Sequence, residues 1–369
     1  MNTLKRLLIG TVLTVLIVAV TLASLEGGAS LLLFERDYRS AEPAAAAVRD
    51  HYAPDTLLGW TGKAAYANAD EYGKGVGLTI DSSGRRITPQ LADSSSPARR
   101  ALVCSGDSYT FGLGVDDAHT WCSQLPQYLP NYRAFNMGQT DYGLDQSALW
   151  FQRGGAGLAP AVHILAVTDG ELERATAESL NGRGKPYFEL KGDKLELRNT
   201  PVAMPSTSKL RSVNAKRELE GLRVVQLLRT RGRFDRDRPI AAKIESSWPL
   251  YEKIFERVAA VRKDSTTLVI AYLPIPRDRR PGEFDKRREK LSALSSKNGI
   301  KFVDLTPEYR ALRADSADLV FITAPVGGFV PNTGLYSNLG HQWIARTLSA
   351  HLQTLGVAAG DNAILKPRP

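Results

Sequence analysis

Residues 101–112 read ALVCSGDSYTFG, and this stretch decides the fold. The apolar residues 101–104 predict a buried strand, and Gly106-Asp107-Ser108 is typical of a tight turn from a strand into a helix. We expect Asp107 to cap that helix and Ser108 to present its hydroxyl at the carboxyl edge of a parallel sheet, where open α/β sheets bind ligands. Many such turns have no chemical role, so the rest of the chain must decide the function.

Apolar strands and amphipathic helices alternate on both sides of this turn. The predicted strands are 134–136, 162–167, 267–273 and 301–305, and the predicted helices lie around 120–129, 144–153, 283–297 and 338–354. This alternation is typical of a parallel sheet covered by helices on both faces, so we predict an α/β/α sandwich of three layers.

One long insertion interrupts the alternation at about residues 175–245. Residues 186–190 and 195–198 alternate around a turn and predict a β-hairpin, and a basic amphipathic helix is predicted at 209–230. An insertion at the carboxyl edge of a sheet is more often a lid than a separate domain.

The N-terminus predicts a membrane anchor. Lys5-Arg6 precedes an apolar run from Leu7 to about Leu25, which is long enough to cross a bilayer, and no clear cleavage site follows. We therefore favour a signal anchor over residues 1–34 rather than a removed signal peptide. The positive flank predicts a cytoplasmic N-terminus, hence a single-pass inner-membrane protein with its C-terminal domain in the periplasm. We expect a linker and lead-in segment over 35–100, the main domain over 101–356 and a tail over 357–369.

The composition and charge of the chain limit the classes of partner that it is expected to bind. The net charge is +9, but Lys and Arg are spread along the chain and no nucleic-acid-binding module accompanies them, so we expect no nucleic-acid partner. The charge is explained by plain solubility, or by an anionic lipid or polysaccharide partner. Export would permit a disulfide between Cys104 and Cys122, although the burial expected for Cys104 favours a free thiol. The sequence shows no metal-site spacing, and we predict no cofactor.

Several ordered blocks resemble the SGNH/GDSL hydrolase superfamily. They are GDSYTFGLGV at 106–115, NMG at 136–138, YGLDQ at 142–146 and KPYF at 185–188. The chain is most similar to membrane-anchored bacterial members with a long insertion, which occur beside cell-envelope and exopolysaccharide functions. The resemblance implies a parallel five-stranded sheet of the flavodoxin-like type.

The resemblance also implies a serine-esterase site with departures. Ser108 takes the position of the nucleophile, and the backbone N–H groups of Ser108 and Gly138 take those of oxyanion donors. Thr168 replaces the asparagine that supplies the third donor. The C-terminal block has Thr333 where the aspartate belongs and Leu335 where the histidine belongs, so the base is missing.

Two functions from different classes follow. The first is an impaired, pseudoenzyme-like protein that binds acylated envelope or exopolysaccharide glycans, or polysaccharide-assembly proteins. The alternative is an active serine esterase, O-acetyl hydrolase or acyltransferase with a displaced base, and an unrelated doubly wound binding protein stays open. We expect Asp107, Asp169 and His119 to lie near the cleft. We favour an exposed loop position for His119 and a structural place in the last helix for His341, with a role as substitute base as the alternative for each.

Overall fold

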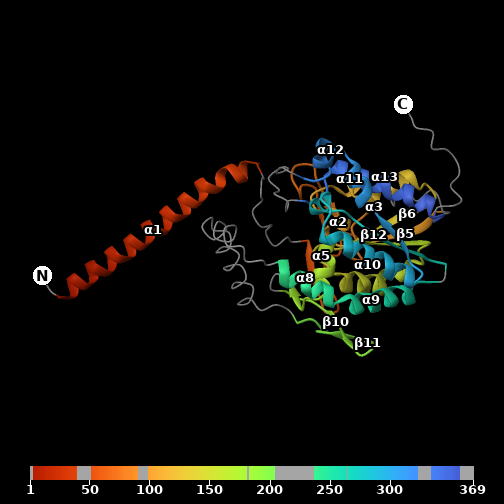
Figure 1. Ribbon diagram of the computed structural model, residues 1–369, viewed down its shortest axis with the longest axis horizontal. Coiled ribbons are helices and arrows are strands. Elements are labelled where there is room, and N and C mark those ends of the chain that lie inside the picture. Colours follow the sequence, from red (N-terminus) through yellow and green to blue (C-terminus); the bar gives the residue numbers. More distant parts are fainter. Residues whose placement is uncertain are drawn as a thin grey trace.

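A five-stranded parallel sheet forms the centre of the protein, as predicted (Figure 1). The computed structural model describes residues 3–39, 51–89, 99–180, 183–203, 237–263, 265–322 and 334–357. The strand order is β13-β12-β7-β5-β6, and neighbouring strands are parallel. The strands are β5 (Arg100–Gly106), β6 (Tyr132–Gly138), β7 (Val162–Val167), β12 (Thr267–Tyr272) and β13 (Lys301–Asp304).

Helices cover both faces of the sheet and form two hydrophobic cores. One face carries α3 (Trp121–Tyr128), α11 (Thr306–Ala311), α12 (Ala314–Leu319) and α13 (Asn338–Thr354). The other carries α4 (Leu144–Trp150), α5 (Asp169–Ala175), α8 (Asp237–Ser246), α9 (Trp248–Val261) and α10 (Glu283–Lys297). Along β5, Leu102 and Cys104 enter the first core and Val103 enters the second. Strands buried on both faces have nearly continuous apolar runs, which explains the sequence of β7.

The strand order places one topological switch point at the carboxyl edge of the sheet. β5 lies between β6 and β7, so the chain leaves β5 and β7 toward opposite sides of the sheet. This is the 2-1-3-4-5 order of flavodoxin-like sheets, whose switch point lies between the first and third strands. Ser108 follows β5 and Thr168 follows β7, so both stand at that switch point.

The lead-in segment packs on the main domain through small two-stranded sheets. β1 (Tyr52–Asp55) pairs with β2 (Gly59–Gly62), and β3 (Ala67–Asn68) pairs with β4 (Leu78–Thr79). Trp60 is 1% exposed, and its indole Nε1 donates to the carbonyl of Thr140, 2.9 Å away. The lead-in is therefore bound to the loop that follows β6.

The described part of the insertion is a hairpin layer on the helices. It holds the short strands β8 (Ser179–Leu180) and β9 (Arg183–Gly184) and the hairpin of β10 (Tyr187–Lys191) and β11 (Lys194–Arg198). Phe188 of β10 enters the same core as Phe255 of α9, and Lys185 forms a buried ion pair with Asp145 of α4 at 2.5 Å. The basic helix predicted at 209–230 lies outside the described residues.

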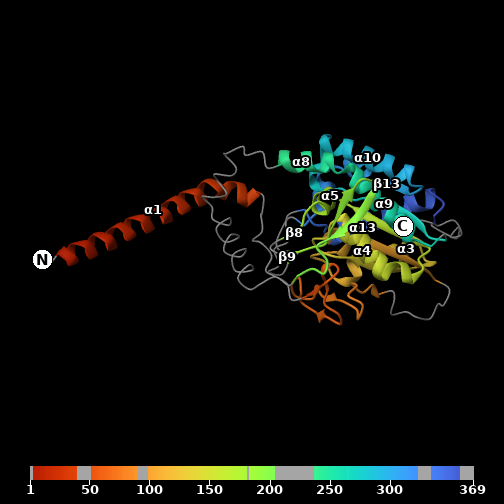
Figure 2. The same ribbon diagram turned by 90° about the horizontal axis from the view of Figure 1, so that it is seen from below.

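The N-terminal helix α1 (Thr3–Arg39) projects from the rest of the protein (Figure 2). Its 21-residue segment Ile9–Ala29 is long and apolar enough to cross a membrane. A signal sequence has the same properties, so the helix alone does not distinguish an anchor from a signal peptide.

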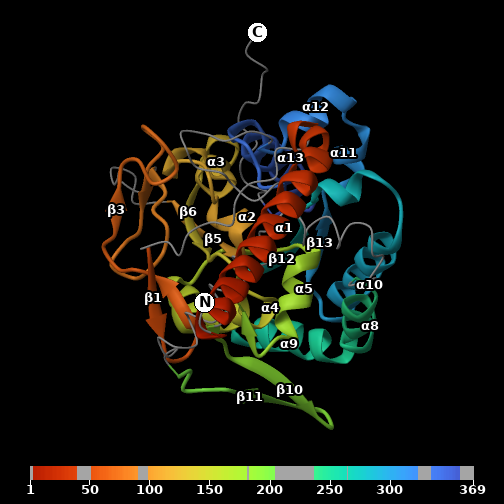
Figure 3. The same cartoon turned by 90° about the vertical axis from the view of Figure 1, so that its left-hand side faces the viewer.

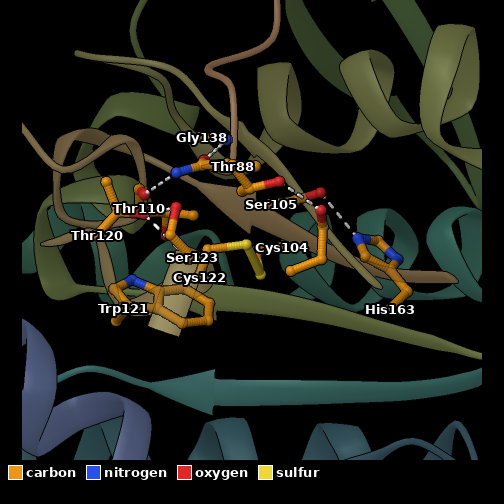
Figure 4. Close-up of a disulfide and its surroundings, with 12 residues drawn as sticks. Thr88, Cys104, Ser105, Thr110, Thr120, Trp121, Cys122, Ser123, Gly138 and His163 are labelled. Carbon is orange, nitrogen blue, oxygen red and sulfur yellow. Dashed lines mark hydrogen bonds between the residues drawn. A yellow bond between two sulfur atoms is a disulfide. The ribbon is translucent and has the colours of Figure 1, made fainter. Parts of the chain in front are cut away.

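Cys104 and Cys122 form a disulfide, so the free thiol favoured for Cys104 is wrong (Figure 4). Cys104 faces the helix layer that holds α3, and Cys122 is the second residue of α3. Their Cα atoms lie 6.2 Å apart, within the range that a disulfide can bridge. The pairing depends on how α3 crosses β5, which the sequence does not reveal.

Candidate functional site

Ser108 begins α2 (Ser108–Phe111), the short helix directly after β5. Asp107 caps this helix as predicted: its Oδ1 accepts from the backbone N–H of Tyr109, 3.0 Å away. Gly112 ends the helix with φ +83°, a left-handed conformation that glycine adopts without strain. Ser108 is half-buried, and its Oγ forms no hydrogen bond with any residue that the structure describes.

Asp107 belongs to a buried polar network and does not face Ser108 as a free base. Its side chain is 2% exposed, and its Oδ2 accepts from Thr168 Oγ1 at 3.1 Å and from Arg174 Nη2 at 2.5 Å. The guanidinium of Arg174 is fixed by a second bond, from Nε to the carbonyl of Tyr142 at 2.7 Å. Burial, together with the nearby Asp107 carboxylate, raises the pKa of Glu171 well above its usual value.

The three expected oxyanion donors are not equally available. The backbone N–H of Ser108 has no acceptor among the described residues, whereas that of Gly138 donates to Asn136 Oδ1 at 2.9 Å. The hydroxyl proton of Thr168 is used in its bond to Asp107. Because oxyanion stabilisation needs donors aimed at the reacting centre, this site retains one ready donor of three.

Close packing between α2 and β6 requires glycine at position 138. A Cβ on Gly138 would lie 2.2 Å from the backbone nitrogen of Phe111, so only glycine lets α2 approach β6 this closely. Asn136 strengthens the same contact, because its Nδ2 donates to the carbonyl of Thr110 at 2.9 Å. β6 therefore fixes the position of α2, and with it that of Ser108.

No histidine contacts Ser108, although all five histidines lie within the described residues. His119 is 48% exposed on the short helix η2 (Asp117–His119), and its Nδ1 lies 2.6 Å from Asp116 Oδ2. His341 is buried within α13 and accepts from the backbone N–H of Trp121, 3.1 Å away, and burial lowers its pKa to about 3. The others contact Glu71 (His51), Ser105 (His163) and Glu308 (His351).

Leu335 of the C-terminal block is buried. Leu335 is 5% exposed, and its carbonyl accepts from the N–H of Ile322 at 2.7 Å. A Cβ on the preceding Gly334 would lie 3.7 Å from the hydroxyl oxygen of Tyr109, so this block lies against the neighbour of Ser108. The side chain of Leu335 is hydrocarbon and carries no proton acceptor. Thr333 lies outside the described residues.

Asp169, which directly follows Thr168, forms an ion pair with α10. It begins α5, and its Oδ1 lies 2.6 Å from Nη1 of Arg287 on α10. The sequence reasoning identified Asp169 but missed both arginines, Arg174 and Arg287, that hold the two acids of the site. Only the spacing of Thr168 and Glu171, that of a capping box, indicated part of this network.

The described residues also contain no group of three or more His, Cys, Asp or Glu side chains arranged to hold a metal ion.

Comparisons with known proteins show likeness in solved structures alone. No protein-family model matches the chain, and no curated protein matches it. A protein described as lipolytic, of the G-D-S-L family, from Desulfitobacterium hafniense is 14% identical with a TM-score of 0.34, covering 68% of this chain and 99% of its own. An alpha/beta hydrolase from the metagenome of Lake Arreo is 15% identical with a TM-score of 0.40, covering 72% and 98%. A protein described as an acylhydrolase, from Bacteroides fragilis, is 12% identical with a TM-score of 0.31, covering 73% and 94%.

Proposed function

We propose that this chain is a membrane-anchored, exported protein of the SGNH-hydrolase-like type that binds acylated envelope or exopolysaccharide glycans without hydrolysing them. One observation carries the proposal: Ser108 stands at the switch point of the sheet, and every histidine of the chain is engaged elsewhere. A serine without a base stays a neutral alcohol at pH 7, and losing a triad member commonly costs about 10⁴–10⁶ in turnover.

The surroundings of Ser108 support binding over hydrolysis. Gly138 and Thr168 use their donors inside the protein, so a tetrahedral intermediate would gain little from them. The hydroxyl and the N–H of Ser108 have no partner among the described residues, which leaves one donor–acceptor pair for a ligand such as an ester or sugar hydroxyl.

An active enzyme is the alternative, and the same free hydroxyl favours it. If a second protein chain supplied the histidine, Ser108 would act as a nucleophile in ester hydrolysis or acyl transfer. Assays of the chain alone and with its envelope partners therefore distinguish the two functions.

The proposed location rests on α1. Lys5-Arg6 precede the span, and the positive-inside rule then exports everything after it, in keeping with the disulfide between Cys104 and Cys122.

The first experiment measures esterase activity of the full chain in mild detergent. We expect no hydrolysis of p-nitrophenyl acetate above the rate of Ser108→Ala, and no labelling by a fluorophosphonate probe. Ser82→Ala is a matched control, because Ser82 is an exposed serine of the lead-in. Turnover that Ser108→Ala abolishes and Ser82→Ala retains would overturn the proposal.

A second experiment restores the missing base. We expect Thr333→Asp with Leu335→His to gain esterase activity over Thr333→Asp with Leu335→Gln, which adds polarity but no base.

Binding is measured by co-sedimentation with an O-acetylated polysaccharide and its deacetylated form. Equal retention on both would contradict recognition of the acyl group.

A further inference from the structure

A cavity of about 360 Å³ opens between the lead-in segment, the loop after α2 and the helices α12 and α13. Its apolar lining comes from Val76, Val115, Leu319, Phe321, Ile322 and Leu339. Neither Ser108 nor any other residue of the proposed site lines it. The volume falls within the range of about 300–1,000 Å³ that small-molecule sites occupy.

Two leucines protrude at the mouth of this cavity. Leu319, at the end of α12, is 58% exposed, and Leu339, in the first turn of α13, is 56% exposed. Among the described residues outside α1, they are the two large hydrophobic side chains that are exposed. Single exposed leucines are common, but a pair from two helices at one apolar opening indicates a binding surface.

The walls of the cavity are held by the fold. The N–H of Ser337 donates to the carbonyl of Val320 at 3.0 Å, and Phe321 forms a β-bridge with Tyr336. On the opposite wall, the carbonyl of Val115 accepts from the buried Arg86 at 2.6 Å. A preformed cavity binds without the cost of ordering its walls.

The lining selects hydrocarbon over charged or sugar ligands. Among the described residues, the cavity is lined by no lysine, arginine or histidine, and its polar contributors include Asp318, Ser337 and Asn338. A phosphate or carboxylate would find no cation there, whereas an alkyl chain would bury its surface against aliphatic and aromatic side chains.

The proposed membrane attachment supplies such chains. α1 ends at Arg39 and β1 begins at Tyr52, and a fully extended chain over that interval reaches at most roughly 45 Å. α1 continues for ten residues, about 15 Å, past the apolar span that ends at Ala29, so the start of the lead-in at β1 stays within roughly 60 Å of the bilayer that α1 would span. We propose that this cavity binds an acyl chain of a phospholipid from that membrane, an inference that rests on the membrane attachment proposed above.

The test uses the full chain in phosphatidylcholine–phosphatidylglycerol vesicles. Leu339→Cys carries a bimane label, and Lys194→Cys on β11 is the matched control, because the hairpin lies at the opposite end of the domain from α12 (Figures 1 and 3). The native cysteines are held in the buried disulfide and stay unlabelled. Lipids with a nitroxide on the acyl chain are expected to quench the label at 339 and to leave that at 194 unchanged.

Two further measurements sharpen the assignment. Leu319→Glu, at an exposed position that folding tolerates, is expected to remove the quenching at 339. Soluble phosphatidylcholines that differ by one methylene are expected to compete with affinities that rise about fourfold per buried methylene.

The outcomes separate the cavity from the anchor. Vesicle flotation with equal quenching at both labels overturns the lipid site and leaves the anchor standing. Loss of flotation overturns both. Fluorescence at 339 that changes with protein concentration in nitroxide-free vesicles places a second copy of the chain at the cavity and also overturns the proposal.

Discussion

Replacing Arg86 with methionine is expected to destabilise the whole site region. The Arg86 side chain is fully buried, and its Nε donates to Asp117 Oδ1 at 2.9 Å. Its Nη1 donates to the carbonyls of Phe111 and Gly112 at 2.9 and 2.5 Å, and its Nη2 donates to that of Val115 at 2.6 Å. One guanidinium from the lead-in therefore satisfies the carbonyl groups at the end of the helix that Ser108 begins.

The magnitude follows from these contacts. Removing one partner of a buried ion pair costs about 3–5 kcal/mol, because the other charge is left unpaired. Asp117 is 14% exposed and keeps the N–H of Thr79 as a donor, so water and this bond offset part of the cost. The orphaned carbonyls of α2 each add to it, at about 1–3 kcal/mol for a fully buried group. The lost ion pair, offset in part at Asp117, and the orphaned carbonyls together are expected to lower the free energy of unfolding of Arg86→Met by at least about 3 kcal/mol.

Urea unfolding followed by tryptophan fluorescence measures this loss. All five tryptophans lie outside α1, so the signal reports on the domain rather than on the membrane helix. Arg85→Met is the matched control: Arg85 is 19% exposed and pairs with Asp81 on the surface, a contact worth about 0–1 kcal/mol. Equal unfolding midpoints for the two variants would refute the reasoning that Arg86 supports α2.

Three further predictions concern the buried groups. Burial lowers the pKa values of His163 and His341 to about 3, so the unfolded chain binds protons that the folded chain does not. As the pH falls from 6.5 to 3, the free energy of unfolding is therefore expected to fall by about 1.4 kcal/mol per pH unit for each histidine. A urea midpoint that stays constant between pH 6.5 and 5 would contradict this. Cys122→Ala is expected to lower the free energy of unfolding by about 2–4 kcal/mol, and an unchanged thermal midpoint would count against a stabilising disulfide. Lys185→Met leaves Asp145 buried and unpaired, at a cost of about 3–5 kcal/mol, whereas adding Asp145→Leu should restore part of it; a double variant no more stable than the single would contradict the pairing.

The elements were predictable where their signal is local. The predicted bounds are correct for the strand at 162–167 and the helices at 283–297 and 338–354. Burial on two faces and helical amphipathicity both produce patterns that can be recognised in a short stretch of sequence. The strand predicted at 134–136 is longer in the structure, Tyr132–Gly138, because pairing with β5 extends it across residues whose own pattern is weak.

The chemistry at the turn was predictable only in part. The position of Ser108, the cap by Asp107 and the hydrocarbon at Leu335 follow from motif and order along the chain. Thr168 was expected to face the cleft, but its hydroxyl bonds to Asp107, because Arg174 and Thr168 share that carboxylate. Such bonds join residues about sixty positions apart and have no signature in the sequence.

The geometry around Ser108 is more rigid than a four-residue helix requires. Arg86 holds its carbonyl end, Asn136 and Gly138 fix it to β6, and the pair of Asp107 and Arg174 fixes its start. Burying two such ion pairs costs desolvation that apolar packing would avoid, so stability alone does not explain them. Fixed geometry does explain them, because a ligand that meets one free hydroxyl and one free N–H gains affinity only if both are held in place. The structure thus fixes the placement of Ser108, while each of the five histidines, all within the described residues, has its contacts elsewhere.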